Sequence, residues 1–281
     1  MNTEQALADL GVTPADFTDE QCRKLDEDGY FVVPDYLTAE QVNELRTEFD
    51  RWEREATPRH DLAIEPGTAV FLHDLFNKSA VFDYCLRCKP TLAAAHYLLG
   101  EIHVYSLNGR NPAKGRGQQG LHSDVPRVGQ NQWRLVNTMI MLDDMTEENG
   151  ATRLVPGSHE WPSLNVPEDN LGGVERPVPS AEEQSLLPAD PMAPHPAEVK
   201  VTGTAGSVCV INAHIWHGGT LNRSGAKRRL LHMAVGRRDI TQGLTQRDVL
   251  TPSLYKRATP TEKYLLDIEG VEPVAPDPES D

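Results

Sequence analysis

The feature that most limits the possible folds of this chain is a series of short apolar segments that begins near residue 101. Each segment is rich in β-branched or aliphatic residues, and glycine, proline, asparagine or aspartate separates it from the next. Short strands separated by turn residues are typical of a β-barrel or a double-sheet jelly roll. We therefore expect a β-core over residues 101–240, built from EIHVYSL, RLVNTMIML, ATRLVP, EVKVTG, SVCVINAHIWH and RRLLHMAVG.

The first hundred residues have the pattern of helices. The spacing from Thr18 to Gln21, and again from Thr38 to Gln41, matches a capping box, in which two side chains bond each other's backbone N–H groups. Apolar residues recur at helical spacing after the second pair. We expect a short strand between these two helices, and a further helix over residues 79–99.

The 281 residues are enough for one large domain. We expect a single domain over residues 1–270, with residues 1–100 as its helical part. Residues 162–196 are rich in proline, glutamate, aspartate and serine, and we expect them to form a long inserted loop. Residues 271–281 are acidic and proline-rich, which predicts a disordered tail.

The net charge of −15 argues against two classes of partner. So acidic a surface repels the backbone of nucleic acids and the headgroups of anionic lipids. The chain has no apolar run long enough to span a bilayer, and its first residues lack the basic region and apolar core of a signal peptide. We therefore expect a cytoplasmic protein with a small-molecule substrate, no nucleic-acid partner and no membrane. The oligomeric state stays open.

The tetrapeptide LHSD contains two candidate metal ligands, His122 and Asp124. On an extended chain, residues two apart point to the same side, so both side chains can converge on one ion. A neutral imidazole and a carboxylate are suitable ligands for Fe(II). The H-x-D pattern alone is weak evidence, because it also occurs in many proteins that bind no metal.

A third candidate ligand lies in the segment SVCVINAHIWHGG. Strand alternation places His217 on the same face as Ile215 and opposite to His214. Turn residues follow, and the return strand brings Arg228 back toward His217. Two histidines and one carboxylate form a facial triad that leaves room for a bidentate cosubstrate and O2. An arginine is always charged and can hold the far end of a dicarboxylate with two hydrogen bonds.

Five stretches of the chain resemble the phytanoyl-CoA dioxygenase family of iron- and 2-oxoglutarate-dependent oxygenases. They are DEDGYFVVPDYLTAEQVNELR, LHSD, LDDMTEENGATRLVPGSH, WHGGTLNRSGAKR and the strand that follows, and together they span residues 18 to about 238. The segment TEENG…PGSH is specific to this family among iron oxygenases. The resemblance implies a mainly β fold, a cupin-like double-stranded β-helix with N-terminal helices packed outside.

The resemblance also implies the cofactors and the residues that bind them. His122, Asp124 and His217 would bind Fe(II), and Arg228 would bind the C5 carboxylate of 2-oxoglutarate. In the family, the distal histidine is followed by N-x-S and, eleven residues on, by this arginine. Asn222, Ser224 and Arg228 stand at the matching positions here.

One position departs from the family pattern. Members often have a serine two residues after the distal histidine that touches the cosubstrate, whereas this chain has Gly219. Thr220 is one possible replacement, and Asn137 on the strand RLVNTMIML is the candidate that we favour for binding the cosubstrate. The alternative is that Asn137 is a buried amide bonded to a neighbouring strand.

The reaction that the resemblance implies is oxidation of an unactivated C–H bond of a small molecule by O2, with release of succinate and CO2. Related halogenases usually have a small apolar residue at the position of Asp124. An aspartate there therefore favours hydroxylation, or a related oxidation such as desaturation, ring closure or epoxidation. A specialised metabolite is the substrate class that we favour.

Two other classes of protein could use the same three ligands. A cupin-like protein could bind a metal without turnover, although a purely structural site does not need Arg228. A zinc hydrolase could also use two histidines and a carboxylate. The metal content and the requirement for 2-oxoglutarate distinguish these two classes of protein from an iron oxygenase.

Overall fold

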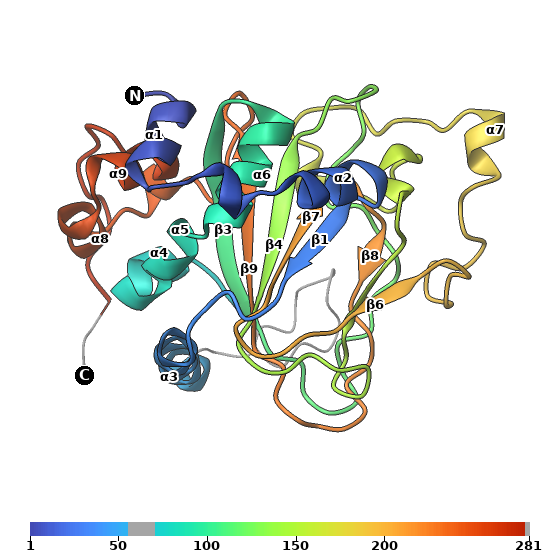
Figure 1. Cartoon of the computed structure of the whole chain (residues 1–281), viewed down its shortest axis with the longest axis horizontal. Coiled ribbons are helices and arrows are strands. Elements are labelled where there is room, and N and C mark those ends of the chain that lie inside the picture. Colours follow the sequence, from blue (N-terminus) through green and yellow to red (C-terminus); the bar gives the residue numbers. More distant parts are fainter. Residues whose placement is uncertain (56–70, 279–281) are drawn as a thin grey trace.

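A computed structural model describes residues 1–55 and 71–278 of the chain (Figure 1). Its strands form two antiparallel sheets, a large one in the order β1-β7-β4-β9-β3-β2 and a small one in the order β6-β5-β8. The strands are β1 (Tyr30–Val33), β2 (Phe71–Leu72), β3 (Ile102–Arg110), β4 (Leu135–Met141), β5 (Thr152–Leu154), β6 (Val199–Val201), β7 (Val208–Asn212), β8 (His217–Gly218) and β9 (Leu230–Arg237).

Helices cover one face of the large sheet and flank its ends (Figure 1). The α-helices are α1 (Thr3–Asp9), α2 (Asp19–Glu27), α3 (Ala39–Glu55), α4 (Leu75–Lys78), α5 (Asp83–Leu86), α6 (Lys89–Leu99), α7 (Ala181–Gln184), α8 (Pro252–Arg257) and α9 (Pro260–Leu266). Short 3-10 helices are η1 (Pro14–Asp16), η2 (Ala80–Phe82), η3 (Ser158–Glu160), η4 (Glu168–Asn170) and η5 (Gln246–Asp248). No helix of the described residues is both long and apolar enough to cross a membrane.

The large sheet is buried on both faces, and strand alternation decides which residues meet which layer. On β4, Val136 and Ile140 point outward into the core shared with the helices, whereas Met139 points inward toward the small sheet. On β9, Leu231 points outward and Leu230 inward in the same way. Two facing sheets with side chains interdigitating between them form the expected double-stranded β-helix.

Helix α6 is the central element of the outer layer (Figure 1). Its Leu92 and Ala95 are fully buried in the core that also contains residues of β4, β7 and β9. A buried hydrogen bond of 2.9 Å joins the Thr91 hydroxyl to that of Thr138 on β4. The expectation of N-terminal helices packed outside the β-core is confirmed.

The capping boxes at Thr18 and Thr38 are both present. The helix predicted over residues 79–99 is instead divided into η2, α5 and α6. Pro90 sits in the first turn of α6. Its ring would clash with the carbonyl four residues earlier, so a helix cannot run from α5 through it.

Helices α8 and α9 were not predicted, although both start with a sequence signal for a helix. Thr251 and Thr259 cap them with side-chain hydrogen bonds, and a proline occupies the first helical position of each. Residues 271–278 have no helix or strand, but Val274 N–H bonds the Leu250 carbonyl at 2.9 Å. The rest of the predicted tail, residues 279–281, lies outside the described residues.

Loss of α6 packing should destabilise the fold strongly. Because Leu92 is fully buried, we expect Leu92→Ala to lower the free energy of unfolding by about 2–5 kcal/mol. Denaturant titration followed by circular dichroism measures this change. The same substitution at Leu186, which is 42% exposed in the long loop, should change the value by less than about 0.5 kcal/mol.

Acid should destabilise the fold partly through His103, a buried residue of β3. Burial, and secondarily Arg238, lowers the pKa of His103 from 6.5 to about 4. Between these values the unfolded chain binds a proton that the folded chain does not, so stability present above pH 6.5 is lost as the pH falls. Between pH 7 and pH 5, we expect the free energy of unfolding to fall by about 2 kcal/mol less in His103→Leu than in wild type. Equal losses in the two proteins would contradict this role.

Candidate metal centre

The structure brings His122, Asp124 and His217 together. One donor atom from each residue lies within 4.8 Å of those of the other two. The Nε2 atom of His122 is 3.7 Å from Asp124 Oδ1, and the Nε2 atom of His217 is 3.4 Å from Asp124 Oδ2. No other group of three or more such ligands converges in this way among residues 1–55 and 71–278.

Backbone pairing places these ligands. The His122 N–H bonds the His217 carbonyl at 3.0 Å, and the His217 N–H bonds the His122 carbonyl at 2.9 Å. Asp124 N–H bonds the carbonyl of Ala213, which follows the end of β7, at 3.0 Å. The LHSD segment is thus an isolated bridge rather than part of a named strand.

The route from β7 to His217 differs from the continuous strand that we predicted. The chain turns between β7 and β8, so that His217 belongs to the small sheet. His214 lies in this turn and packs at 5.2 Å against Trp133, away from the triad. The prediction that His217 and His214 face different surroundings is confirmed, although by a change of sheet and not by alternation alone.

Second hydrogen bonds orient both imidazole rings. The Nδ1 atom of His122 lies 3.0 Å from the Gly120 carbonyl, and that of His217 lies 3.0 Å from the Ile215 carbonyl. Because a carbonyl only accepts, each Nδ1 has the proton and each Nε2 presents a lone pair toward Asp124. This is the arrangement in which histidines bind metals.

The charge state also suits a divalent cation. Burial, followed by the proximity of His217, lowers the pKa of His122 to about 4. Burial alone would raise the pKa of the Asp124 carboxyl, but His217, followed by the other nearby histidines and Arg110, brings it below its usual value. Two imidazole nitrogens and one carboxylate form a donor set that fits Fe(II).

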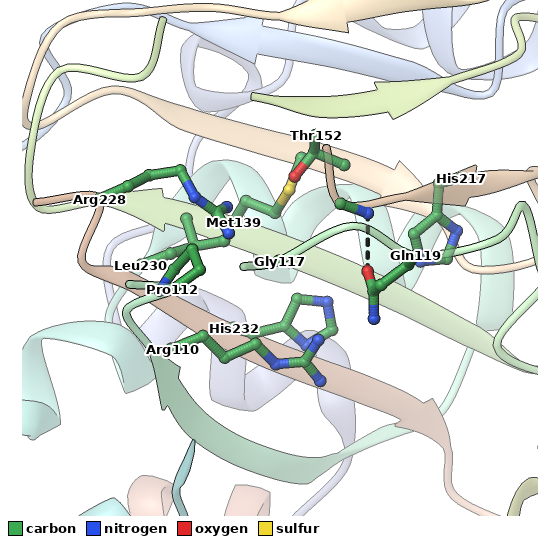
Figure 2. A pocket seen from close by; sticks show the side chains of 11 residues that line it. Arg110, Pro112, Gly117, Gln119, Met139, Thr152, His217, Arg228, Leu230 and His232 are labelled. Carbon is green, nitrogen blue, oxygen red and sulfur yellow. Dashed lines mark hydrogen bonds between the residues drawn. The ribbon is translucent and has the colours of Figure 1, made fainter. Parts of the chain in front are cut away.

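An enclosed pocket extends from His217 to Arg228 (Figure 2). The Arg228 side chain is 6% exposed, and its guanidinium has no hydrogen bond or ion pair with any residue in the described ranges. Burial lowers the pKa of Arg228 to about 10, so the group is still charged at neutral pH. A buried cation without a counter-ion is costly, and an anionic ligand would satisfy it.

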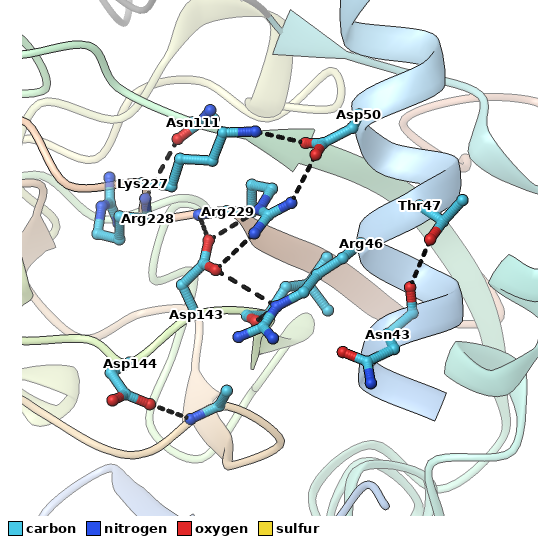
Figure 3. Close-up of polar contacts among 12 residues, drawn as sticks. Asn43, Arg46, Thr47, Asp50, Asn111, Asp143, Asp144, Lys227, Arg228 and Arg229 are labelled. Atoms are coloured by element: carbon cyan, nitrogen blue, oxygen red, sulfur yellow. Dashed lines mark hydrogen bonds and ion pairs between the residues drawn. The ribbon is translucent and has the colours of Figure 1, made fainter. Parts of the chain in front are cut away.

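The next residue in the chain shows the opposite arrangement. Arg229 pairs with Asp143 at 2.7 Å and with Asp50 of α3 at 2.9 Å (Figure 3). Arg46 of α3 also pairs with Asp143, at 3.3 Å. These ion pairs fasten α3 to the start of β9, and thereby fix the backbone from which Arg228 reaches the pocket.

The Gly117 carbonyl and the Gln119 side chain occupy the space that the family's serine would need. A side-chain atom on Gly219 would collide with the Gly117 carbonyl. The Gln119 amide oxygen accepts a hydrogen bond of 2.6 Å from the Gly219 N–H, and Gln119 lines the pocket (Figure 2). Thr220 does not replace the serine, because its hydroxyl bonds the Ala151 carbonyl at 2.7 Å.

Asn137 has a different neighbour from the one that we expected. Its amide donates a short hydrogen bond to Asp124 Oδ2. Asn137 lines a wider cavity beside Asp124 and is not among the residues around Arg228. Its predicted contact with a cosubstrate stays a prediction, whereas its position indicates that it orients the Asp124 carboxylate.

The wider cavity has a volume of about 470 Å³ and reaches the metal centre at Asp124. Its wall combines apolar, amide and acidic side chains. They include Phe71, Asp74, Tyr105, Asn108, Arg110, Leu135, Asn137, Asp169, Asn170 and Leu244. Arg110 and His232 line both this cavity and the enclosed pocket, and sequence reasoning did not select either for the site.

The long loop supports the segment that contains His122 and Asp124. Ser123 N–H bonds the Leu164 carbonyl at 2.7 Å, and Leu121 N–H bonds the Pro191 carbonyl at 2.8 Å. Arg153 of β5 is 1% exposed, and its guanidinium bonds the carbonyls of residues 119, 191 and 193 at 2.8–2.9 Å. It also pairs with Glu198 at 3.1 Å. The two ends of the loop are therefore attached beside the metal ligands.

A double-stranded β-helix with two histidines and one carboxylate at its centre defines the non-haem iron oxygenase class of site. Residues 25–230 match the family model described as Phytanoyl-CoA dioxygenase (PhyH). This range is most of the chain, and the chain belongs to the phytanoyl-CoA dioxygenase family.

Individual relatives are distant. The chain is 32% identical to Dioxygenase ALT11 of Alternaria alternata over 54% of this chain and 57% of that protein, so it spans little more than half of that relative's length. It is 28% identical to the Ectoine dioxygenase of Bordetella parapertussis over 73% of this chain and 70% of that protein. The solved structure of HygX from Streptomyces hygroscopicus, with nickel, 2-oxoglutarate and hygromycin B bound, shares the fold with a TM-score of 0.59. That match has 19% identity and covers 80% of this chain and 89% of that one.

Removal of the Asn137 amide should weaken metal binding. Because that amide bonds the Asp124 carboxylate, we expect Asn137→Ala to raise the dissociation constant for Co(II) roughly 10- to 100-fold. Titration followed by the visible absorption of Co(II) measures this value. Asn43→Ala, on an exposed surface of α3, is the matched control, and equal affinities in both variants would contradict the proposed contact.

Proposed function

We propose that this protein is an Fe(II)- and 2-oxoglutarate-dependent dioxygenase that oxidises, most simply hydroxylates, a C–H bond of a small molecule. The observation that supports this function most directly is the buried Arg228, whose guanidinium has no partner among the described residues and lies at the far end of a pocket from His217. A purely structural metal site has no need for such a cation.

The residues of the chain fit both cofactors. His122, Asp124 and His217 would hold Fe(II), and Arg228 would bind the remote carboxylate of 2-oxoglutarate. The iron, with O2 and 2-oxoglutarate bound, supplies the oxidising chemistry and yields succinate and CO2 as by-products. The protein's part is to hold these groups in register and to keep water out of the enclosed pocket.

The charges in the pocket complement a dianion. Arg228 is buried and Arg110 is partly buried, and burial lowers the pKa of each to about 10, so both are cationic at neutral pH. The charge of Asp124 acts on Arg110 in the opposite direction to burial, and a bound metal would offset that charge. Two cations and a metal in a low-dielectric pocket favour a ligand with two carboxylates.

The substrate would occupy the wider cavity beside Asp124. The amides of Asn108, Asn137 and Asn170, and the carboxylates of Asp74 and Asp169, offer hydrogen bonds to hydroxyl or amino groups. A volume of about 470 Å³ suits a small or medium-sized molecule. The names of the relatives, which include an ectoine dioxygenase, and the hygromycin B in HygX agree with a polar small molecule.

Anaerobic titration of the Fe(II)-loaded protein with 2-oxoglutarate tests the cofactor assignment. We expect a weak visible charge-transfer band in the wild type and at least a tenfold higher dissociation constant for 2-oxoglutarate in Arg228→Ala, because a charged hydrogen-bond pair is lost. Arg223→Gln, exposed in the same loop, removes one positive charge as Arg228→Ala does, and should behave as wild type. No band in folded, iron-loaded wild type would favour the zinc or binding-protein alternative.

Asp124→Ala should abolish both metal binding and turnover. The loss of one of three ligands, and of the only carboxylate in the cluster, removes the charge that holds the cation. Bound iron, and succinate formed from 2-oxoglutarate, are the two measurements. Asp248→Ala, an exposed carboxylate in η5, is the control. Near-wild-type succinate formation by Asp124→Ala at saturating iron would overturn the triad.

A further inference from the structure

The geometry points to His232 as a cosubstrate-binding residue: we propose that its imidazole hydrogen-bonds the end of 2-oxoglutarate that lies at the metal. Neither the sequence pattern nor the family resemblance selected this residue. The inference rests on the proposed function, because it requires 2-oxoglutarate in the enclosed pocket.

The position of His232 follows from its place on β9. Arg228, Leu230 and His232 are two residues apart in turn, so their side chains share the inward face of the sheet. His232 pairs with Met139 of β4 on one side and with Asn108 of β3 on the other. Met139 lines the enclosed pocket and Asn108 lines the wider cavity, and His232 lines both.

The ring of His232 has no hydrogen-bond partner in the protein. His122 and His217 each have a backbone carbonyl on Nδ1, whereas no residue in the ranges 1–55 and 71–278 makes a hydrogen bond to His232. Its nitrogens are also absent from the buried polar atoms sealed off from solvent. They therefore face the open space of the pocket, where a ligand can reach them.

The chemistry of the ring suits an anionic ligand. Burial, followed by the proximity of Arg110, lowers the pKa of His232 to about 3, so the ring is neutral near pH 7. A neutral imidazole presents one N–H donor and one acceptor. Inside an enclosed pocket its N–H can donate to a carboxylate, and a hydrogen bond to a charged acceptor is stronger than one to a neutral acceptor.

The direction of the His232 ring indicates which end of the cosubstrate it would contact. In Figure 2, the His232 ring points toward the end of the pocket where Gln119 and His217 lie, and away from the Arg228 guanidinium. Arg228 would hold the remote carboxylate, so His232 is left to contact the end that binds the metal. His232 would thus fix how the cosubstrate sits on the metal, in addition to how tightly it binds.

The test compares His232→Leu and His232→Asn with wild type in anaerobic Fe(II) and 2-oxoglutarate titrations. We expect His232→Leu to raise the dissociation constant for 2-oxoglutarate roughly tenfold, and to shift the position of the charge-transfer band. His232→Asn keeps an N–H donor, so a smaller loss is expected. His232→Asn can also be titrated in place of His232→Leu if the latter folds poorly.

His103→Leu is the matched control, because His103 is a buried histidine on the neighbouring strand β3 that does not line either cavity. It should leave both the 2-oxoglutarate affinity and the band unchanged. Co(II) affinity, measured separately, should be equal in all four proteins, which excludes damage to the metal site. A shift of the band is not expected from a loss of stability alone.

Two outcomes distinguish this inference from the proposed function. If wild type shows the band and His232→Leu has the same affinity and the same band position, the role of His232 at the cosubstrate is overturned, and only a contact with the substrate would remain. If wild type itself shows no band, the proposed function fails, and the inference about His232 fails with it.

Discussion

The two backbone hydrogen bonds between His122 and His217, at 3.0 and 2.9 Å, are the contact on which the site depends. They join a segment outside the named strands to the first residue of β8, and they set the register of both histidines at once. A shift of one residue in this pairing would turn one imidazole away from Asp124. The triad therefore depends on backbone pairing as much as on the choice of ligands. The contacts that hold the LHSD segment in place are thus also needed to form the metal centre.

A second constraint is the cation in the interior. Burial of the Arg228 guanidinium is unfavourable for the fold by itself, because this charge has no partner among the described residues. The Arg229 ion pairs with Asp143 and Asp50 secure the strand that presents Arg228. The fold thus holds a charged group in an unfavourable place, an arrangement that suits a binding site prepared in advance for an anion.

Local patterns in the sequence predicted the strands other than β2 and β8, the capped helices α2 and α3, the fold class and the convergence of His122, Asp124 and His217. These features depend on periodicity or on short motifs. The roles of Gln119, Arg153 and His232 could not be predicted in this way. Gln119 is held in the pocket by a hydrogen bond from the N–H of Gly219, one hundred residues later, where no side chain fits. Arg153 matters because of carbonyls up to 40 residues away. The sequence does not distinguish His232 from other polar residues of a strand, because its position is recognised only from the two cavities that it lines.

The attachment of the long loop at both its ends has a consequence for how such a protein can change over evolutionary time. Leu164 and Pro191 are bonded to the LHSD segment, and Arg153 clamps the second end. The intervening residues, including α7, extend away from the β-core (Figure 1). Asn165 and Asn170 also bond the carbonyls of Leu121 and Asp124, so it is beyond Asn170, around α7, that insertions, deletions and substitutions need not disturb the ligands. This part of the chain can therefore diversify while the metal centre stays constant.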